Sequence, residues 1–284
     1  MSDSGLGACD FGACAPSPRE ERWRRLAHRL PYNYWGRKAA SLLLGPAGGR
    51  SGRPADVAVF GAQRARLHPS DNICEKRVYI TPQLWDPAER AILAVKIRDH
   101  ASDVFIFADI GANAGLYSLF ARAECLTAQK NLRAICVEAD PEMRRRLGFN
   151  IAASGAETEI AVAACAAAAR DGRMRFHVEA SSRGLSRLDD AGEIEVQARP
   201  ITSILADSKF DRIDAMKIDI EGAEFEALEA FFNTAAPPLR PGLLIVETSH
   251  EAPGRSVASL VQRHGYETIL KTRLNTVLKR ENAV

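Results

Sequence analysis

Hydrophobic and polar residues follow one another in blocks that predict strands alternating with helices. The first strong block is the apolar run VFIFADI at 104–110, which is typical of a strand buried on both faces of a parallel sheet. A glycine-containing turn and the helical segment LYSLFARAE come next. Helices separate the further strands, which are expected at residues 133–140, 159–165, 213–220 and 242–248. This alternation predicts an α/β fold with a doubly wound sheet, which a terminal hairpin over 266–280 completes.

The chain before this sheet has a different pattern. Residues 1–20 are rich in Gly, Ser, Ala and Pro and are expected to lack fixed structure. Basic and apolar residues are interleaved over 19–44, which predicts one or two amphipathic helices broken near Pro31. Strands are then expected at residues 56–61 and 76–81, and a helix at 87–100.

These patterns divide the chain at residue 70. Residues 1–70 are expected to form an N-terminal extension, partly disordered, and residues 71–284 the main domain. The basic amphipathic segment at 19–44 either packs on that domain or contacts a membrane surface or a partner. We favour packing on the domain.

Composition narrows the class of protein. The chain has 284 residues, 46% hydrophobic and 26% charged, as in ordinary globular proteins. It has no apolar run of about 18 residues, the length that predicts a membrane-spanning helix. Its first residues lack the pattern of a secretory signal, and its six cysteines form no CxxC pair. We therefore expect a cytoplasmic protein.

Charge is distributed unevenly between the two regions. The formal net charge is +2, but residues 1–70 carry +6 and the remainder carries −4. Binding to nucleic acid depends on clustered cations that neutralise phosphates. The acidic main domain therefore argues against a nucleic-acid partner.

The central chemical motif is DIGANAG, residues 109–115, between the first strong strand and its helix. Gly111 and Gly115 allow a sharp turn and the close approach of a ligand to the backbone. A dinucleotide fingerprint has a glycine where this chain has Asn113. Asp109, two residues before the first glycine, suits a cationic ligand. The sulfonium and amino groups of S-adenosylmethionine supply that positive charge.

A second acid lies at the end of the next strand. Glu138, in CVEAD, follows the glycine turn by the 20–25 residues at which an acid hydrogen-bonds ribose hydroxyls. The glycine turn and this acid together predict a cofactor that contains adenosine.

A third polar group follows the later strands. Asp219, in KIDIEGAE, ends one strand, and Glu247 and His250 follow the next one. Ligands of open α/β sheets bind beyond the carboxyl ends of the strands, so these three residues are candidate members of one catalytic site. Either Asp219 or His250 is expected to accept a proton from a hydroxyl. The carboxylates offer oxygen ligands to a divalent cation, but their spacing does not require one, and we predict no metal.

The segments DIGANAGLYS, VEADP, KIDIEGAEFEAL and LLIVET together resemble the FkbM family of S-adenosylmethionine-dependent methyltransferases, over about residues 100–270. The resemblance implies a class I methyltransferase fold, Rossmann-like, with seven strands of which the last is antiparallel. It also implies O-methylation of a sugar, glycan or small-molecule hydroxyl. Carried onto this chain, it places Asp109, Gly111, Asn113 and Gly115 at the methionine end of the cofactor, Glu138 at the ribose and Asp219 at the transfer site.

Three other functions stay open at this point. A nucleic-acid methyltransferase is one of them, although the acidic main domain and the lack of an NPPY-like tetrad argue against it. An NAD-dependent oxidoreductase has the same kind of sheet and ribose-binding acid, although Asn113 and KIDIEGAE argue against it. A membrane-associated binding protein without catalysis would use residues 19–44. The acceptor is expected to be a small molecule or carbohydrate selected by the N-terminal region and the loop at 180–195.

Overall fold

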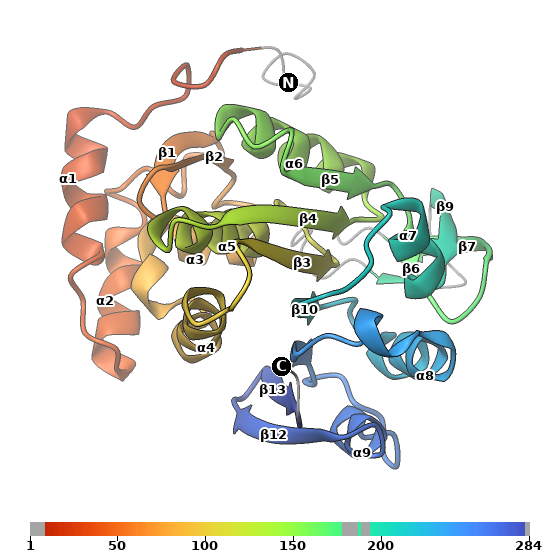
Figure 1. The fold of residues 1–284 in the computed structure, drawn as a ribbon. Coiled ribbons are helices and arrows are strands. Elements are labelled where there is room, and N and C mark those ends of the chain that lie inside the picture. Colours follow the sequence, from red (N-terminus) through yellow and green to blue (C-terminus); the bar gives the residue numbers. More distant parts are fainter. Residues whose placement is uncertain (1–8, 178–186, 189–193, 282–284) are drawn as a thin grey trace.

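The structure, a computed structural model, describes residues 9–177, 187–188 and 194–281. A seven-stranded sheet with the order β12-β13-β11-β10-β3-β4-β5 forms its centre (Figure 1). The strands are β3 (Val104–Ile110), β4 (Asn131–Val137), β5 (Ile160–Ala163), β10 (Ala215–Ile218), β11 (Leu243–Glu247), β12 (Tyr266–Lys271) and β13 (Asn275–Arg280). β13 alone runs antiparallel to its two neighbours, β11 and β12, and the other strand pairs of this sheet are parallel. The predicted α/β sheet with an antiparallel last strand and a terminal hairpin is therefore confirmed.

Helices cover both faces of this sheet (Figure 1). Phe105 and Phe107 of β3 pack on one face with α4, α5 and α6, whereas Ile106 and Ala108 pack on the other with α7, α8 and α9. The alternation follows from the two-residue period of a strand. The helices are α4 (Pro87–Arg98), α5 (Leu116–Thr127), α6 (Pro141–Ala153), α7 (Ile201–Asp207), α8 (Glu224–Thr234) and α9 (Val257–Gln262), with a 3-10 turn, η4 (Pro237–Leu239).

Two smaller sheets accompany the central one. An antiparallel hairpin consists of β1 (Ala55–Val59) and β2 (Gln63–Leu67), so the strand predicted at 56–61 is confirmed. The other small sheet has the order β6-β9-β7-β8. Its strands are β6 (Ala166–Ala167), β7 (Gly172–His177), β8 (Arg187–Leu188) and β9 (Ile194–Arg199).

The N-terminal segment forms two helices, α1 (Pro18–Ala27) and α2 (Tyr34–Leu43), with the predicted break around Pro31. The segment packs on the domain: the His28 imidazole contacts the Tyr79 carbonyl oxygen at 3.1 Å, and Ala27 is fully buried. The outer surface of these helices exposes the large side chains Trp23, Leu26, Tyr34, Trp35 and Leu42. Among the described residues, no helix is both long enough and apolar enough to span a membrane.

The structure differs from expectation at the start of the chain. Residues 9–17 were expected to lack structure, but the Asp56 carboxylate accepts hydrogen bonds from the backbone N–H of Gly12 at 2.8 Å and of Cys14 at 2.9 Å. Asp56 also forms a buried ion pair with Arg66 at 2.7 Å. A distant buried carboxylate therefore orders a segment whose composition alone predicts disorder. Residues 1–8 lie outside the described part.

The strand predicted at 76–81 is wrong, because this segment belongs to helix α3 (Ile73–Ile80), which a 3-10 turn follows, η2 (Pro82–Leu84). The Asn72 side chain caps the helix by accepting a hydrogen bond from the Glu75 N–H at 3.0 Å. Glu75, Val78 and Tyr79 are buried at helical spacing. Packing and capping thus outweigh the strand preference of a short β-branched run.

Candidate active site

The glycine turn between β3 and α5 has a conformation that other residues would strain. Gly111 has φ +77° and Gly115 has φ +80°. A Cβ atom at Gly111 would collide with the backbone carbonyl of Asp219, and one at Gly115 would collide with the Leu147 side chain. Gly111 therefore lets the β3 turn approach the end of β10, which brings two of the predicted motifs into contact.

Asn113 fixes this turn with its backbone and its side chain. It has φ +52°, a left-handed conformation that asparagine tolerates better than most residues. Its side-chain oxygen accepts hydrogen bonds from the Ala114 N–H and the Asn72 amide, both at 2.8 Å. The Asn113 N–H donates to Glu138 at 2.7 Å. Asn113 thus connects the glycine turn to α3 and to the acid after β4.

Glu138 is buried at the end of β4, with 7% of its surface exposed. One carboxylate oxygen accepts the Asn113 N–H at 2.7 Å and the other accepts the Asp140 N–H at 2.8 Å. Burial raises the pKa of Glu138 to about 7, although these backbone donors oppose the shift. Each oxygen of a carboxylate has a second lone pair, which leaves Glu138 able to accept from a ligand.

Asp109 lies behind the glycine turn and is almost fully buried. One of its oxygens accepts hydrogen bonds from the Ser118 N–H at 3.1 Å and the Ser118 hydroxyl at 2.8 Å. Burial raises the pKa of Asp109 to about 7 against the opposing effect of Ser118. Asp109 therefore holds the first turn of α5 in place.

A buried lysine organises the carboxylates at the ends of β10 and β11. Lys217 is 2% exposed, and its ammonium group lies 3.1 Å from Asp219. Burial alone would raise the pKa of Asp219, but the charge of Lys217 lowers it below its usual value. Burial and the neighbouring Asp219 carboxylate raise the pKa of Glu247 to about 9. At neutral pH Asp219 is therefore ionised and Glu247 is protonated.

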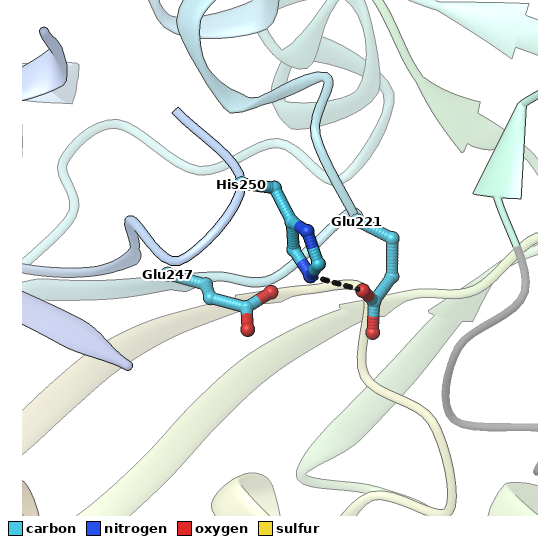
Figure 2. A group of neighbouring side chains, drawn as sticks. All are labelled: Glu221, Glu247 and His250. Atoms are coloured by element: carbon cyan, nitrogen blue, oxygen red, sulfur yellow. Dashed lines mark ion pairs between the residues drawn. The ribbon is translucent and has the colours of Figure 1, made fainter. Parts of the chain in front are cut away.

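His250 and Glu221 form an ion-pair contact beside these carboxyl groups (Figure 2). The His250 Nε2 lies 3.2 Å from a Glu221 oxygen, and about half of the His250 side chain is exposed. Glu247 lies next to this pair and accepts the Ser249 hydroxyl at 2.7 Å. The three side chains point toward one another, and His250 lies between the two glutamates (Figure 2).

Two overlapping groups of residues offer metal-ligand atoms that lie within 4.8 Å of one another: Glu221, Glu247 and His250, and Asp219, Glu224 and Glu247. Lys217 already supplies a positive charge at Asp219. Both oxygens of Glu224 accept backbone N–H groups, from Ile220 at 2.8 Å and Gly222 at 2.9 Å. In the second group, Asp219 and Glu224 therefore already have partners within the protein. The absence of a metal stays a prediction.

One cavity of about 440 Å³ connects all of these groups. Its lining includes Asp109, Gly111, Asn113 and Glu138 at one end, and Asp219, Glu247 and His250 at the other. Gly115, behind the turn, is absent from the lining. Seven of the eight predicted site residues therefore line one space.

Sequence reasoning assigned no role to several residues of this lining, including Arg77, Trp85, Asp86, Tyr117 and Lys217. The Tyr117 hydroxyl donates to Asp86 at 3.0 Å. Lys217 had a usable signal, because it is a charged residue within the buried strand AMKI. Arg77, Trp85 and Asp86 had no such signal in the sequence, because they lie before the first recognised motif. The predicted specificity loop at 180–195 lies almost wholly outside the described residues.

The chain matches a protein-family model and is similar to individual known proteins. The family model described as "Methyltransferase FkbM domain" matches residues 109–268. AMB antimetabolite synthetase AmbE of Pseudomonas aeruginosa is 26% identical in a 205-residue alignment, with 57% of this chain and 10% of that protein covered. The chain thus corresponds to a small part of that synthetase.

Solved structures also resemble the chain. The methyltransferase FkbM from Methylobacillus flagellatus is 18% identical, with 91% of this chain and 57% of that one covered and a TM-score of 0.45. TrmK of M. capricolum, solved in complex with S-adenosylhomocysteine, is 11% identical, with 66% and 65% covered and a TM-score of 0.39. The family match covers more than half of the chain, including the glycine turn, Glu138 and the KIDIEGAE segment. The chain belongs to the FkbM family of methyltransferases.

Proposed function

We propose that the chain is an S-adenosylmethionine-dependent O-methyltransferase that acts on a hydroxyl of a sugar, glycan or small metabolite. The observation that carries this proposal is the single cavity that contains both the glycine turn with Glu138 and the ionised Asp219 with His250. A methyl transferase needs these two ends in one space, because the donor and the acceptor must meet in line.

The residues present fit the proposed donor. Glu138 has lone pairs for the two ribose hydroxyls, and Gly111 gives the turn the space of a missing side chain. The carboxyl group of Asp109 lies near the expected methionine end, where a bound cation would favour its ionised form. When bound, S-adenosylmethionine supplies a methyl group that its sulfonium already activates.

The transfer end would orient the acceptor and remove its proton. Asp219, kept ionised by Lys217, accepts a hydrogen bond from the acceptor hydroxyl and aligns it. His250, with Nε2 beside Glu221, has Nδ1 as the ring acceptor for the proton when the imidazole is neutral. Protonated Glu247 does not compete for that proton.

Labelled methyl transfer tests this assignment. With an acceptor mixture of glycans and metabolites, Asp219→Ala is expected to lower transfer by about 10²–10⁴-fold. S-adenosylhomocysteine binding, measured by calorimetry, is expected to persist. His250→Ala should lower transfer with the same retention of binding. Methyl transfer by Asp219→Ala at close to the wild-type rate would contradict the proposed role of Asp219.

The alternatives have less support. Membership of a methyltransferase family favours methyl transfer over nicotinamide-dependent oxidation. The packing of α1 on α3 engages part of the segment that a membrane-associated binding protein would use.

A further inference from the structure

A second cavity of about 470 Å³ adjoins the active-site cavity. We name it the basic pocket. It lies between α2, α3, the start of α4 and the turn before β13, and the N-terminal extension thus forms one of its walls. Four residues line both cavities: Arg77, Asp86, Arg273 and Leu274.

The shared wall lies at the transfer end of the active site. Asp86 is close enough to Lys217 for their charges to alter each other's pKa, and it accepts a hydrogen bond from the Tyr117 hydroxyl at 3.0 Å. Asn113 and Glu138 line only the active-site cavity. A molecule in the basic pocket therefore approaches the active-site cavity from the side of Asp86 and Lys217, the partner of Asp219.

The charged groups of the basic pocket favour an anion. Its cations are Arg37, Lys76, Arg77 and Arg273 and its acids are Asp86 and Glu89. Asp86 accepts a hydrogen bond from the Tyr117 hydroxyl, and Glu89, 3% exposed, accepts one from the Thr272 hydroxyl at 2.8 Å. The charge of Arg77 also acts on Asp86, so the excess of cations is four to two. None of the four cations forms an ion pair with another described residue.

Arg77 is the strongest of these observations. Its residue is only partly exposed, yet its guanidinium has no hydrogen-bond or ion-pair partner within the described residues. A guanidinium has five N–H donors, and those of Arg77 are accessible, because they are not among the buried side-chain atoms that lack a hydrogen-bond partner. In other half-buried or buried arginines of this chain, such as Arg122 and Arg146, carboxylates satisfy the donors. Arg77 thus has donors available to a ligand.

The first turn of α4 adds backbone donors to the same pocket. Its N-cap residue, Asp86, makes no capping hydrogen bond, and Pro87 occupies the first helical position. Within the described residues, the N–H groups of Ala88 and Glu89 have no acceptor, and both residues line the pocket. Free N–H groups at the start of a helix favour a bound anion.

We propose that the basic pocket binds a phosphate or carboxylate group of the methyl acceptor. The acceptor is then an anionic hydroxyl compound, such as a sugar phosphate or a sugar acid, with its charge held by Arg77 and its hydroxyl at Asp219. This inference rests on the proposed methyltransferase function and adds the chemical class of the substrate.

Calorimetry on the full chain with S-adenosylhomocysteine present tests the pocket directly, with inorganic phosphate and acetate as probes. At least one probe is expected to bind at millimolar concentration. Arg77→Gln and Lys76→Gln should each weaken that binding about tenfold or more, because a charge-assisted hydrogen bond is lost. Lys38→Gln, a matched change on α2 outside both cavities, should leave it unchanged. Binding of neither probe, or equal binding by all variants, would overturn the proposal.

Labelled methyl transfer to an extract of small molecules identifies the source of the charge. The labelled product is expected to be retained by an anion-exchange column. Loss of retention after alkaline phosphatase indicates a phosphate, and continued retention indicates a carboxylate. Transfer only into unretained products would overturn this inference and leave the methyltransferase function standing. Failure of S-adenosylhomocysteine to bind would instead contradict the proposed function.

Discussion

Different kinds of contact hold the two ends of the active-site cavity. At the glycine turn, the contacts are short, buried and mostly made by backbone N–H groups, as at Glu138, where both oxygens accept main-chain donors. At the transfer end, charged side chains contact one another: Lys217 with Asp219, and His250 with Glu221. The first end is thus held mainly by main-chain donors, and the second by contacts between charged side chains.

This difference matches the demands on each end. A common cofactor can be held by one fixed arrangement of main chain, whereas proton transfer needs groups whose charge state can change. Helices α2 and α3, which lie outside the matched family region, contribute to the basic pocket at the transfer end. Specificity for the acceptor is then separable from cofactor binding, and substitutions at the two ends should have different consequences.

The largest effect is expected at the contact between the two ends. Gly111→Ala places a Cβ against the carbonyl of Asp219 and should lower the free energy of unfolding by about 3 kcal/mol or more. Gly61→Ala is the matched control, because Gly61 has a similar φ of +81° but open space around it. That control should cost only about 1–2 kcal/mol. Equal losses of unfolding free energy in the two variants, measured by urea unfolding, would contradict the predicted collision at Gly111.

The next effect concerns protonation at the transfer end. In Lys217→Met, the pKa of Asp219 should rise, since the charge that lowers it is gone. A reaction that requires ionised Asp219 is lost as pH falls through that pKa. The acidic limb of the kcat/KM profile should therefore move to higher pH, while S-adenosylhomocysteine still binds. An unmoved limb would show that Asp219 does not control it.

At the cofactor end, the pKa of Glu138 predicts a pH-dependent affinity. Ribose hydroxyls donate more strongly to an ionised carboxylate, and burial raises the pKa of Glu138 to about 7. S-adenosylhomocysteine should therefore bind more tightly at pH 8 than at pH 6. Glu138→Gln should weaken binding about tenfold and remove most of this pH dependence. A variant that keeps the full dependence would place its origin elsewhere.

The same raised pKa has the opposite consequence for folding of the free chain. Glu138 and Asp109 have folded-state pKa values of about 7, above their usual ones, so the folded state binds more protons than the unfolded state between those values. Their contribution to stability is thus present at low pH and is lost as pH rises toward 7. In Glu138→Gln, urea unfolding at pH 5 and pH 8 should differ less than in the wild type.

The smallest effect is expected from metal removal. Because Lys217 supplies the positive charge at Asp219, EDTA should leave methyl transfer unchanged. Loss of transfer in EDTA, restored by Mg²⁺ or Mn²⁺, would identify the acidic group with His250 as a metal site.

The fold was predictable because each motif-bearing strand has its own apolar run and is followed by a helix. VFIFADI gave β3 at its observed bounds, and the terminal hairpin was also correct. Local pattern failed where distant contacts decide structure. Residues 73–80 form a helix because Asn72 caps it and because Arg146, from α6, forms an ion pair with Glu75 at 2.9 Å.

The site was predictable only where chemistry follows a strand end. Asp219 and Glu247 could be grouped because parallel strands end on the same edge of a sheet. Lys217 is only two residues from Asp219, but Arg77 and Asp86 are far in sequence from the other site residues and meet them only through the fold. Such contacts depend on how α3 and α4 fold back over the sheet, which periodicity does not specify.

Calorimetric titration of the 284-residue chain with S-adenosylhomocysteine, alongside NADH, tests the proposed cofactor most directly. We expect saturable binding of S-adenosylhomocysteine that Glu138→Gln weakens, and no binding of NADH. A folded chain that binds NADH, or that does not bind S-adenosylhomocysteine, would contradict this expectation.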